Sequence, residues 1–329
     1  MTTIWKLHTK TSTKDGDKKI AQYLLDNQIL ALGWSLKDKD LIGNVKEEDL
    51  EKAREDRKKI ESIKDYYDFC YEYKVYKNYV NGNVNRFTRE IEEGDLIWMR
   101  YDGIYYLARF NSNSEVIYNC TQETLDNDAC IQITNVNWQK IGDESSVPGA
   151  VATAFINRLT FCRINQEGVV NFSKFIYDKV AETNYYEDKE LTFNQEKFYN
   201  FISTTDCEDL LCMYLNKEYG YVVIPSTNKK STELYECVLL DPQTGKNIFI
   251  QVKKGDDPLK PEDYFHLDGD VYLLTTKGKV ENYDKEKHKN ITVVDPKELF
   301  NYLSHEDFQN YLPQSIKYWI ELLGGYKKN

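Results

Sequence analysis

The chain has 329 residues, of which 41% are hydrophobic and 29% charged, a composition typical of a globular protein long enough for two domains. It contains no apolar run of about 18 residues, and its opening MTTIWKLHTK lacks the plan of a signal peptide, so we expect a cytoplasmic protein with no membrane partner. The net charge of −11 disfavours a general cationic coat for nucleic acid. Seven cysteines without a CxxC pair and four scattered histidines disfavour a disulfide framework, a zinc site and a histidine-based triad.

The first half of the chain contains several short runs with strand composition and few helical patterns. An Asp102-Gly103 pair between two apolar runs predicts a tight hairpin, because this dipeptide accepts the positive φ angles of hairpin turns. Several short strands in succession favour a small β-barrel with helices. The expected strands are residues 4–8, 29–34, 91–101, 104–110, 129–138 and 159–164, and the expected helices are 19–27, 46–64, 66–79 and 150–157.

The second half is organised around a predicted hairpin. Two apolar runs, Leu234–Leu240 and Asn247–Lys253, flank a turn that contains Pro242 and Gly245. Because strand side chains alternate, Gln251 and Lys253 share one face. With Glu236 on the paired strand, this face suits a hard cation with oxygen ligands and a positive charge beside a phosphate. A solvent-exposed strand face would carry the same residue types.

Helices and strands alternate around this hairpin. A helix begins near Glu208, with Asp206 as its expected N-cap, and short strands are expected at 220–225, 271–275 and 291–295. The alternation favours a mixed αβ sheet with helices on its faces. We place the domain boundary near residues 165–170, giving domains 1–167 and 168–329, the second starting with a helical connector. The sequence contains neither a P-loop nor a GxSxG motif.

The order of these elements resembles the PD-(D/E)XK nuclease superfamily in its Mrr-like variant, in which glutamine replaces the second acid. The resemblance covers roughly residues 205–278. It implies an Mg²⁺ or Mn²⁺ cofactor and a restriction-endonuclease-like core. It assigns the metal-binding acid to Glu236, the variant second acid to Gln251, the catalytic lysine to Lys253, the accessory acid to Glu208 with Asp209 next in line, and a metal-binding carbonyl to Val252.

Two features leave this assignment open. Many relatives carry aspartate where this chain has Glu236, and Glu233 and Asp241 are close enough in sequence to be the main metal acid instead.

The loop before the first hairpin strand carries Lys229 and Lys230, which would contact a phosphate backbone, although such a loop is more often only flexible and polar.

The first half resembles the EVE/PUA-like barrels found at the front of some restriction enzymes, over roughly residues 3–165. The segments that carry the resemblance are Ile4-Trp5, residues 32–35 (LGWS), residues 93–97 (EGDLI) and residues 148–151 (PGAV). It implies nucleic-acid binding, with a modified base held in an aromatic cage. The candidates for the cage are Trp5, Trp34, Trp98 and Tyr101, although such rings more often fill a core. Trp34, at the expected end of a strand, is the strongest candidate.

Together these features predict a type IV-like restriction endonuclease for phage defence, which hydrolyses DNA carrying a modified base, such as a modified cytosine, and acts as a homodimer. A non-catalytic protein that binds a modified base or RNA is the alternative, favoured by Glu236 and by the acidic second half. A third hypothesis is an RNA nuclease. A test of whether the protein prefers RNA or DNA would separate it from the DNA endonuclease. The base modification and the cleavage pattern do not follow from the sequence.

Overall fold

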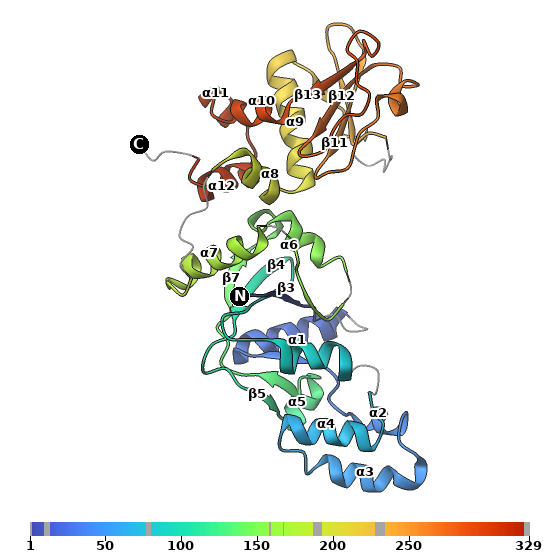
Figure 1. The fold of residues 1–329 in the computed structure, drawn as a ribbon, viewed down its shortest axis with the longest axis vertical. Coiled ribbons are helices and arrows are strands. Elements are labelled where there is room, and N and C mark those ends of the chain that lie inside the picture. The colour runs from blue at the N-terminus through green and yellow to red at the C-terminus, as the bar shows by residue number, and fades with distance from the viewer. Residues whose placement is uncertain are drawn as a thin grey trace. The chain divides into compact units, whose positions relative to one another are not determined.

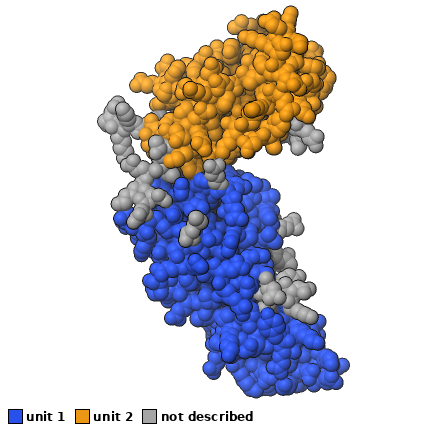
Figure 2. All heavy atoms as spheres, in the orientation of Figure 1, with its two compact units in different colours: residues 1–189 blue, residues 190–329 orange. Residues whose placement is uncertain are grey.

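The structure is a computed structural model that describes residues 2–9, 14–76, 80–157, 159–166, 168–186, 193–227 and 234–325. The chain divides into two compact units, Met1–Lys189 and Glu190–Asn329, called unit 1 and unit 2 below (Figure 2). Both units are mixed α+β, as expected. Within the described residues, no helix is long and apolar enough to span a membrane.

Unit 1 contains two open sheets (Figure 1). The larger has the order β7-β4-β3-β1-β8, in which β1 and β3 are parallel and the other neighbours are antiparallel. The smaller is antiparallel, with the order β2-β6-β5. The strands are β1 (Ile4–Leu7), β2 (Leu30–Leu32), β3 (Leu96–Tyr101), β4 (Ile104–Arg109), β5 (Val116–Tyr118), β6 (Ile131–Ile133), β7 (Gln139–Gly142) and β8 (Phe161–Arg163).

The sheet pairing differs from the closed barrel expected for unit 1. Among the described residues, β7 and β8 form open edges of the larger sheet, and the smaller sheet is separate from it. The predicted hairpin at Asp102-Gly103 is confirmed, with φ angles of 49° and 79° at the two turn residues and direct pairing of β3 with β4. Local turn chemistry therefore predicts neighbouring strands, whereas barrel closure depends on long-range pairing.

Helices and short helical turns cover the sheets of unit 1. The expected connector helix α7 packs on β1, β4 and β7, so it belongs to unit 1, and the compact units divide later in the chain than residues 165–170. The helical elements are α1 (Lys14–Asn27), α2 (Asp38–Ile42), η1 (Glu47–Asp49), α3 (Leu50–Arg57), α4 (Ile63–Glu72), η2 (Val80–Val84), η3 (Arg86–Glu90), α5 (Gln122–Asp126), η4 (Glu144–Ser146), α6 (Gly149–Ala154) and α7 (Val169–Ala181).

Unit 2 is built on one mixed sheet with the order β13-β12-β11-β10-β9 (Figure 1). Strand β10 pairs antiparallel with both β9 and β11, whereas β11 pairs parallel with β12 and β12 parallel with β13. The elements are α8 (Gln195–Phe201), α9 (Thr204–Tyr219), β9 (Val222–Val223), β10 (Cys237–Leu240), β11 (Asn247–Lys253), η6 (Pro261–Tyr264), β12 (Asp270–Thr275), β13 (Ile291–Val294), α10 (Pro296–Tyr302), α11 (Glu306–Gln309) and α12 (Gln314–Leu322).

Helix α9 packs against β11 and carries one of the predicted acids. It begins after Ser203, whose hydroxyl accepts a hydrogen bond from the Asp206 amide. Asp206 therefore closes a capping box at the third helical position and is not the N-cap that we expected. Its other carboxylate oxygen accepts a hydrogen bond from Ser315, which ties α12 to the start of α9.

Candidate functional site

Glu236 and Gln251 face each other across the predicted hairpin. The Glu236 amide donates to the Ile250 carbonyl at 2.9 Å. Cys237 is paired with Ile250 in the register of β10 and β11, so one step earlier along the chain Glu236 lies opposite Gln251. Paired residues project on the same side of a sheet, so the Glu236 and Gln251 side chains meet. The Gln251 Nε2 donates to the Glu236 Oε1 at 3.0 Å. The structure thus brings together Glu236, the expected metal-binding acid, and Gln251, the expected variant second acid.

Gln251 is 1% exposed, and its amide is only partly satisfied. Nε2 contacts Glu236 and lies 3.5 Å from the Val252 carbonyl, but Oε1 is buried and accepts no hydrogen bond from the described residues. An unsatisfied buried acceptor costs on the order of 1–3 kcal/mol. Such a group in a native fold calls for an explanation, and a bound cation is one.

Glu208 shares the electrostatic environment of this pair. Burial raises the pKa of its carboxyl to about 7, helped by repulsion from Glu236 and Asp209 and opposed by the charge of Lys253. Lys253 lies two residues after Gln251 on β11, so it projects on the same face, where it is partly exposed. Helix α9 and strand β11 thus bring Glu208 and Lys253, the expected accessory acid and lysine, into one electrostatic environment with Glu236.

The oxygen atoms that could serve a cation here are the carboxylates of Glu236 and Glu208, the Gln251 amide oxygen and the Val252 carbonyl, while the Gln251 atom that faces Glu236 is the nitrogen Nε2. In the part of the chain that the structure describes, no group of three or more His, Cys, Asp or Glu side chains could hold a metal ion. Oxygen ligands suit Mg²⁺ or Mn²⁺, and Mg²⁺ is commonly bound by one or two carboxylates together with substrate phosphates and waters. The residues present therefore fit a hard cation that shares its shell with a phosphate.

Asp241, another candidate acid, is not part of this constellation. Asp241 lies at the far end of β10, where its carboxylate accepts hydrogen bonds from the Gln243 amide and the Thr244 hydroxyl and so stabilises the turn. Glu233, Lys229 and Lys230 lie outside the described residues. Of the described alternatives, Glu236 is the acid that meets Gln251.

Two neighbouring residues were missed by the sequence analysis. Tyr264 on η6 is buried, and burial, helped by the charges of Asp263 and Glu236, raises its pKa to about 12. Nothing in its sequence context distinguishes it from a core tyrosine. Lys254 follows Lys253, but its ammonium donates to the Asn200 and Ile202 carbonyls and has a structural role.

The four aromatic residues expected to form a base cage in unit 1 are not gathered in one pocket. Trp5 is fully buried, donates from Nε1 to Asp95 Oδ2 at 2.8 Å and stacks on Phe161. Trp98 is also fully buried and donates to the Ser173 hydroxyl at 2.9 Å. Both rings are satisfied core residues. Tyr101 is half-buried at the end of β3 and packs on the same core.

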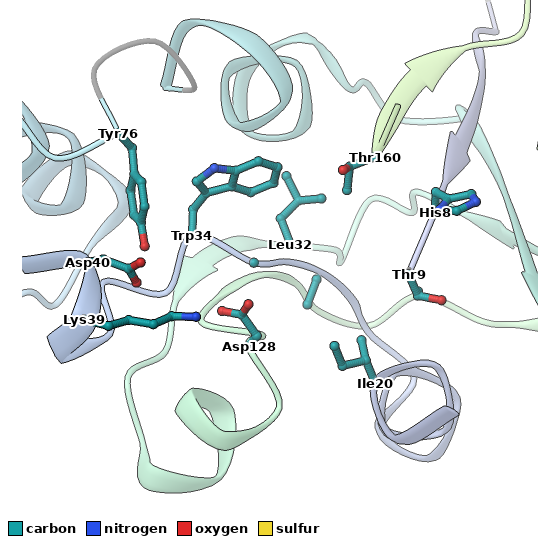
Figure 3. A pocket seen from close by; sticks show the side chains of 12 residues that line it. His8, Thr9, Ile20, Leu32, Trp34, Lys39, Asp40, Tyr76, Asp128 and Thr160 are labelled. Atoms are coloured by element: carbon teal, nitrogen blue, oxygen red, sulfur yellow. The ribbon is translucent and has the colours of Figure 1, made fainter. Parts of the chain in front are cut away.

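Trp34, in contrast, lines a cavity of about 290 Å³ (Figure 3). The polar residues of this pocket were not among the candidates expected from the sequence. Burial, followed by a hydrogen bond to Asp40, raises the pKa of Tyr76. The residues that line the cavity are His8, Thr9, Ile20, Ala31, Leu32, Gly33, Trp34, Lys39, Asp40, Tyr76, Asp128 and Thr160.

The chain thus carries a metal-type constellation in unit 2 and an aromatic pocket in unit 1. The first can hold a cation beside a lysine, which is the arrangement needed to bind and polarise a phosphate. The second offers a ring for stacking and polar groups at its rim. Comparisons of the chain with protein-family models, with curated proteins and with solved structures give no match.

Proposed function

We propose that the chain is a divalent-metal-dependent endonuclease that hydrolyses DNA phosphodiester bonds. The observation that carries this proposal is the buried Gln251 amide, which contacts Glu236 and leaves its own Oε1 without a partner among the described residues. A buried amide oxygen without a partner in the described part of the chain, on a residue whose Nε2 contacts a carboxylate, is a group that a bound cation would satisfy. We also propose that unit 1 selects DNA with a modified base.

The residues of unit 2 have different roles in this proposed reaction, according to their chemistry. Glu236, Glu208 and the Gln251 Oε1 would hold Mg²⁺ or Mn²⁺, with the Val252 carbonyl nearby. A divalent cation at this position supplies Lewis acidity toward the scissile phosphate and lowers the pKa of a bound water. Lys253 stabilises the negative charge that develops on the phosphate oxygens. Glu208 must be ionised to bind, so its raised pKa makes binding stronger above pH 7.

The order of elements in unit 2 supports a restriction-endonuclease-like core of the Mrr-like PD-(D/E)XK type. An acid on α9 precedes an antiparallel hairpin, and the hairpin strand β11 then runs parallel to β12. For unit 1 we propose an EVE/PUA-like module whose sheets are open in the described residues. We further propose a homodimer, since two active sites can cut both strands.

The second candidate function is a non-catalytic protein that binds a modified base or RNA. The specific observation in its favour is the small ligand set, in which two carboxylates supply the charge of the metal site. In that case the core of unit 2 would be a nuclease-like remnant. Metal-dependent cleavage separates the two candidates, and an RNA arm in the same assay tests sugar preference.

The test incubates the full chain with phage DNA that carries modified cytosines, with matched unmodified DNA and with RNA, in Mg²⁺ or EDTA. Lys253→Ala and Glu236→Ala are expected to lower cleavage by at least roughly 100-fold, since each removes a group that stabilises transition-state charge. Lys246→Ala is the matched control, because this exposed lysine lies in the turn of the same hairpin.

Each outcome of this assay decides between the functions. Mg²⁺-dependent cutting of modified DNA alone, lost in both site variants and kept in the control, supports the proposal. Cutting of both DNAs keeps the nuclease and removes the selection by unit 1. A gel shift of modified DNA without any cutting favours the binding protein, and cutting of RNA alone favours the RNA nuclease.

A further inference from the structure

The pocket of unit 1 pairs an aromatic ring with a carboxylate whose hydrogen-bonding capacity is unused. Figure 3 shows the Asp128 carboxylate pointing toward the Trp34 ring, with the end of Lys39 beside it. The Asp128 Oδ1 lies 3.6 Å from the Lys37 ammonium, which is an ion pair too long for a hydrogen bond. The Asp128 side chain is 38% exposed, so a ligand can reach it.

The other carboxylate of the pocket, Asp40, is already engaged. One of its oxygens accepts a hydrogen bond from the Lys37 amide at 2.9 Å, as part of the N-terminal cap of α2. Its carboxylate also binds the Tyr76 hydroxyl, which lies next to it in Figure 3. Asp40 therefore positions Tyr76 and the start of α2. Asp128, in contrast, receives no hydrogen bond on its carboxylate from the described residues and can serve a ligand.

The backbone around the pocket is held in an unusual conformation. Trp34, Tyr76 and Asp128 have φ angles of 63°, 55° and 51°, in the left-handed region that bulky residues rarely adopt. Strain of this kind tends to persist where it serves a site. Gly33 permits the close approach of Asp128, because a Cβ at position 33 would lie 3.1 Å from the Asp128 Oδ2. The fold thus brings this carboxylate against the strand end that carries Trp34.

The charge and size of the pocket indicate what it binds. Two carboxylates outnumber the single lysine of the described lining, Lys39, which disfavours a phosphate, and a volume of about 290 Å³ suits a single planar ring system. A base stacked on Trp34 would present its edge to Asp128, and a carboxylate accepts hydrogen bonds but donates none. A thymine would place a carbonyl oxygen against it, whereas a cytosine would place its exocyclic amino group there.

We propose that Asp128 is the specificity-determining residue of this pocket and selects an extruded base that carries an exocyclic amino group. This inference rests on the proposal that unit 1 selects a DNA base, and it adds the chemical class of that base. It is independent of the cutting step, because it concerns binding alone. Asp128 discriminates 5-methylcytosine from thymine, two bases that share the 5-methyl group and differ in the amino group at C4 and the proton on N3.

The experiment measures binding of the full chain in EDTA to fluorescent duplexes with one test base opposite an abasic site, which eases extrusion. Two matched pairs are used, 5-methylcytosine with thymine and 5-hydroxymethylcytosine with 5-hydroxymethyluracil, so that the result does not depend on one modification. We expect the amino-bearing member of at least one pair to bind roughly 10-fold more tightly. Asp128→Asn should remove most of this preference, because the amide can donate to a carbonyl.

Asn is suited to the left-handed backbone at position 128, so this variant is expected to fold. Asp126→Asn is the matched control, since it changes the same charge at an exposed position two residues away. Equal binding within both pairs, binding of none of the duplexes, or a preference retained in Asp128→Asn would overturn the inference. A preference for the amino base that depends on Asp128, found without any cleavage in Mg²⁺, would support the inference while the proposed nuclease fails.

Discussion

The tryptophans in the core of unit 1 and the hairpin of unit 2 differ in how their buried polar groups are satisfied. In unit 1 the buried indole nitrogens of Trp5 and Trp98 each have a hydrogen-bond acceptor. In unit 2 the buried amide of Gln251 has an oxygen without a partner among the described residues, and Glu208 keeps a carboxyl whose pKa is raised to about 7. A buried polar group without a partner calls for an explanation, and a ligand that completes the site is one. The described part of unit 1 carries such atoms too, on Tyr105, Arg109 and Asn127, but there they lie outside the expected site residues. Within unit 1, Trp98 is fully buried, whereas Trp34 is partly exposed and lines a cavity.

The largest expected effect tests this distinction among the tryptophans. Trp98→Ala should lower the free energy of unfolding by about 3–5 kcal/mol, because it removes a fully buried ring and leaves the Ser173 hydroxyl without its donor. Trp34→Ala should cost only about 1–2 kcal/mol, since this ring is partly exposed. Chemical denaturation measures both values.

Binding of DNA provides the complementary readout for the same two variants. Trp34→Ala should lose binding to duplexes with an extruded base while it retains a cooperative unfolding transition. A Trp98→Ala protein that is as stable as the wild type, or a Trp34→Ala protein that binds these duplexes normally, would contradict the distinction between a core ring and a pocket ring.

The contrast between the units also explains what the sequence could predict. Alternation along β11 and the turn at its start bring Gln251 and Lys253 to one face and Glu236 opposite them, and local patterns suffice for this. The pocket of unit 1 gathers residues from His8 to Thr160, which long-range packing alone brings together. A tryptophan in a core and a tryptophan in a pocket have the same local sequence signals.

The architecture of unit 1 was also predictable only where local sequence patterns determine it. The Asp102-Gly103 hairpin followed from turn chemistry, but the parallel pairing of β1 with β3 joins strands far apart in the chain. That pairing places β8 at an open edge in the described residues, and no local pattern encodes it. Likewise α7 was assigned to the second domain because its sequence does not show that Ser173 binds Trp98.

The next effect concerns the carboxyl of Glu208 and depends on pH. Its pKa rises from 4.5 to about 7 in the folded state, so between these values the native protein binds more protons than the unfolded chain. The free energy of unfolding should therefore fall as pH rises through this window, by about 1–2 kcal/mol after allowance for a half-exposed group. Glu208→Gln should remove this decline, measured by denaturation in EDTA from pH 4.5 to 8.

A bound cation should offset this fall in the free energy of unfolding at high pH. Added Mn²⁺ is expected to raise the melting temperature of the wild type at pH 8 and to have little effect on Glu208→Gln, since binding to the native state alone stabilises it. Glu321→Gln, an exposed change on α12, is the control and should behave as the wild type. If the Mn²⁺ response were equal in all three proteins, Glu208 would not contribute to a metal site.

The smallest expected effect compares two buried glutamines, one from each unit. Gln251→Met should change the free energy of unfolding in EDTA by no more than about 1 kcal/mol, because losing the bond to Glu236 is offset by removing an oxygen that has no partner. Gln132→Met should cost about 1–3 kcal/mol, because the Gln132 amide donates to the Ala129 carbonyl and hydrogen-bonds Tyr23. Only Gln251→Met should also weaken the Mn²⁺-dependent rise in melting temperature. Equal costs for the two glutamines would mean that the Gln251 oxygen is satisfied in solution and that the buried amide is structural.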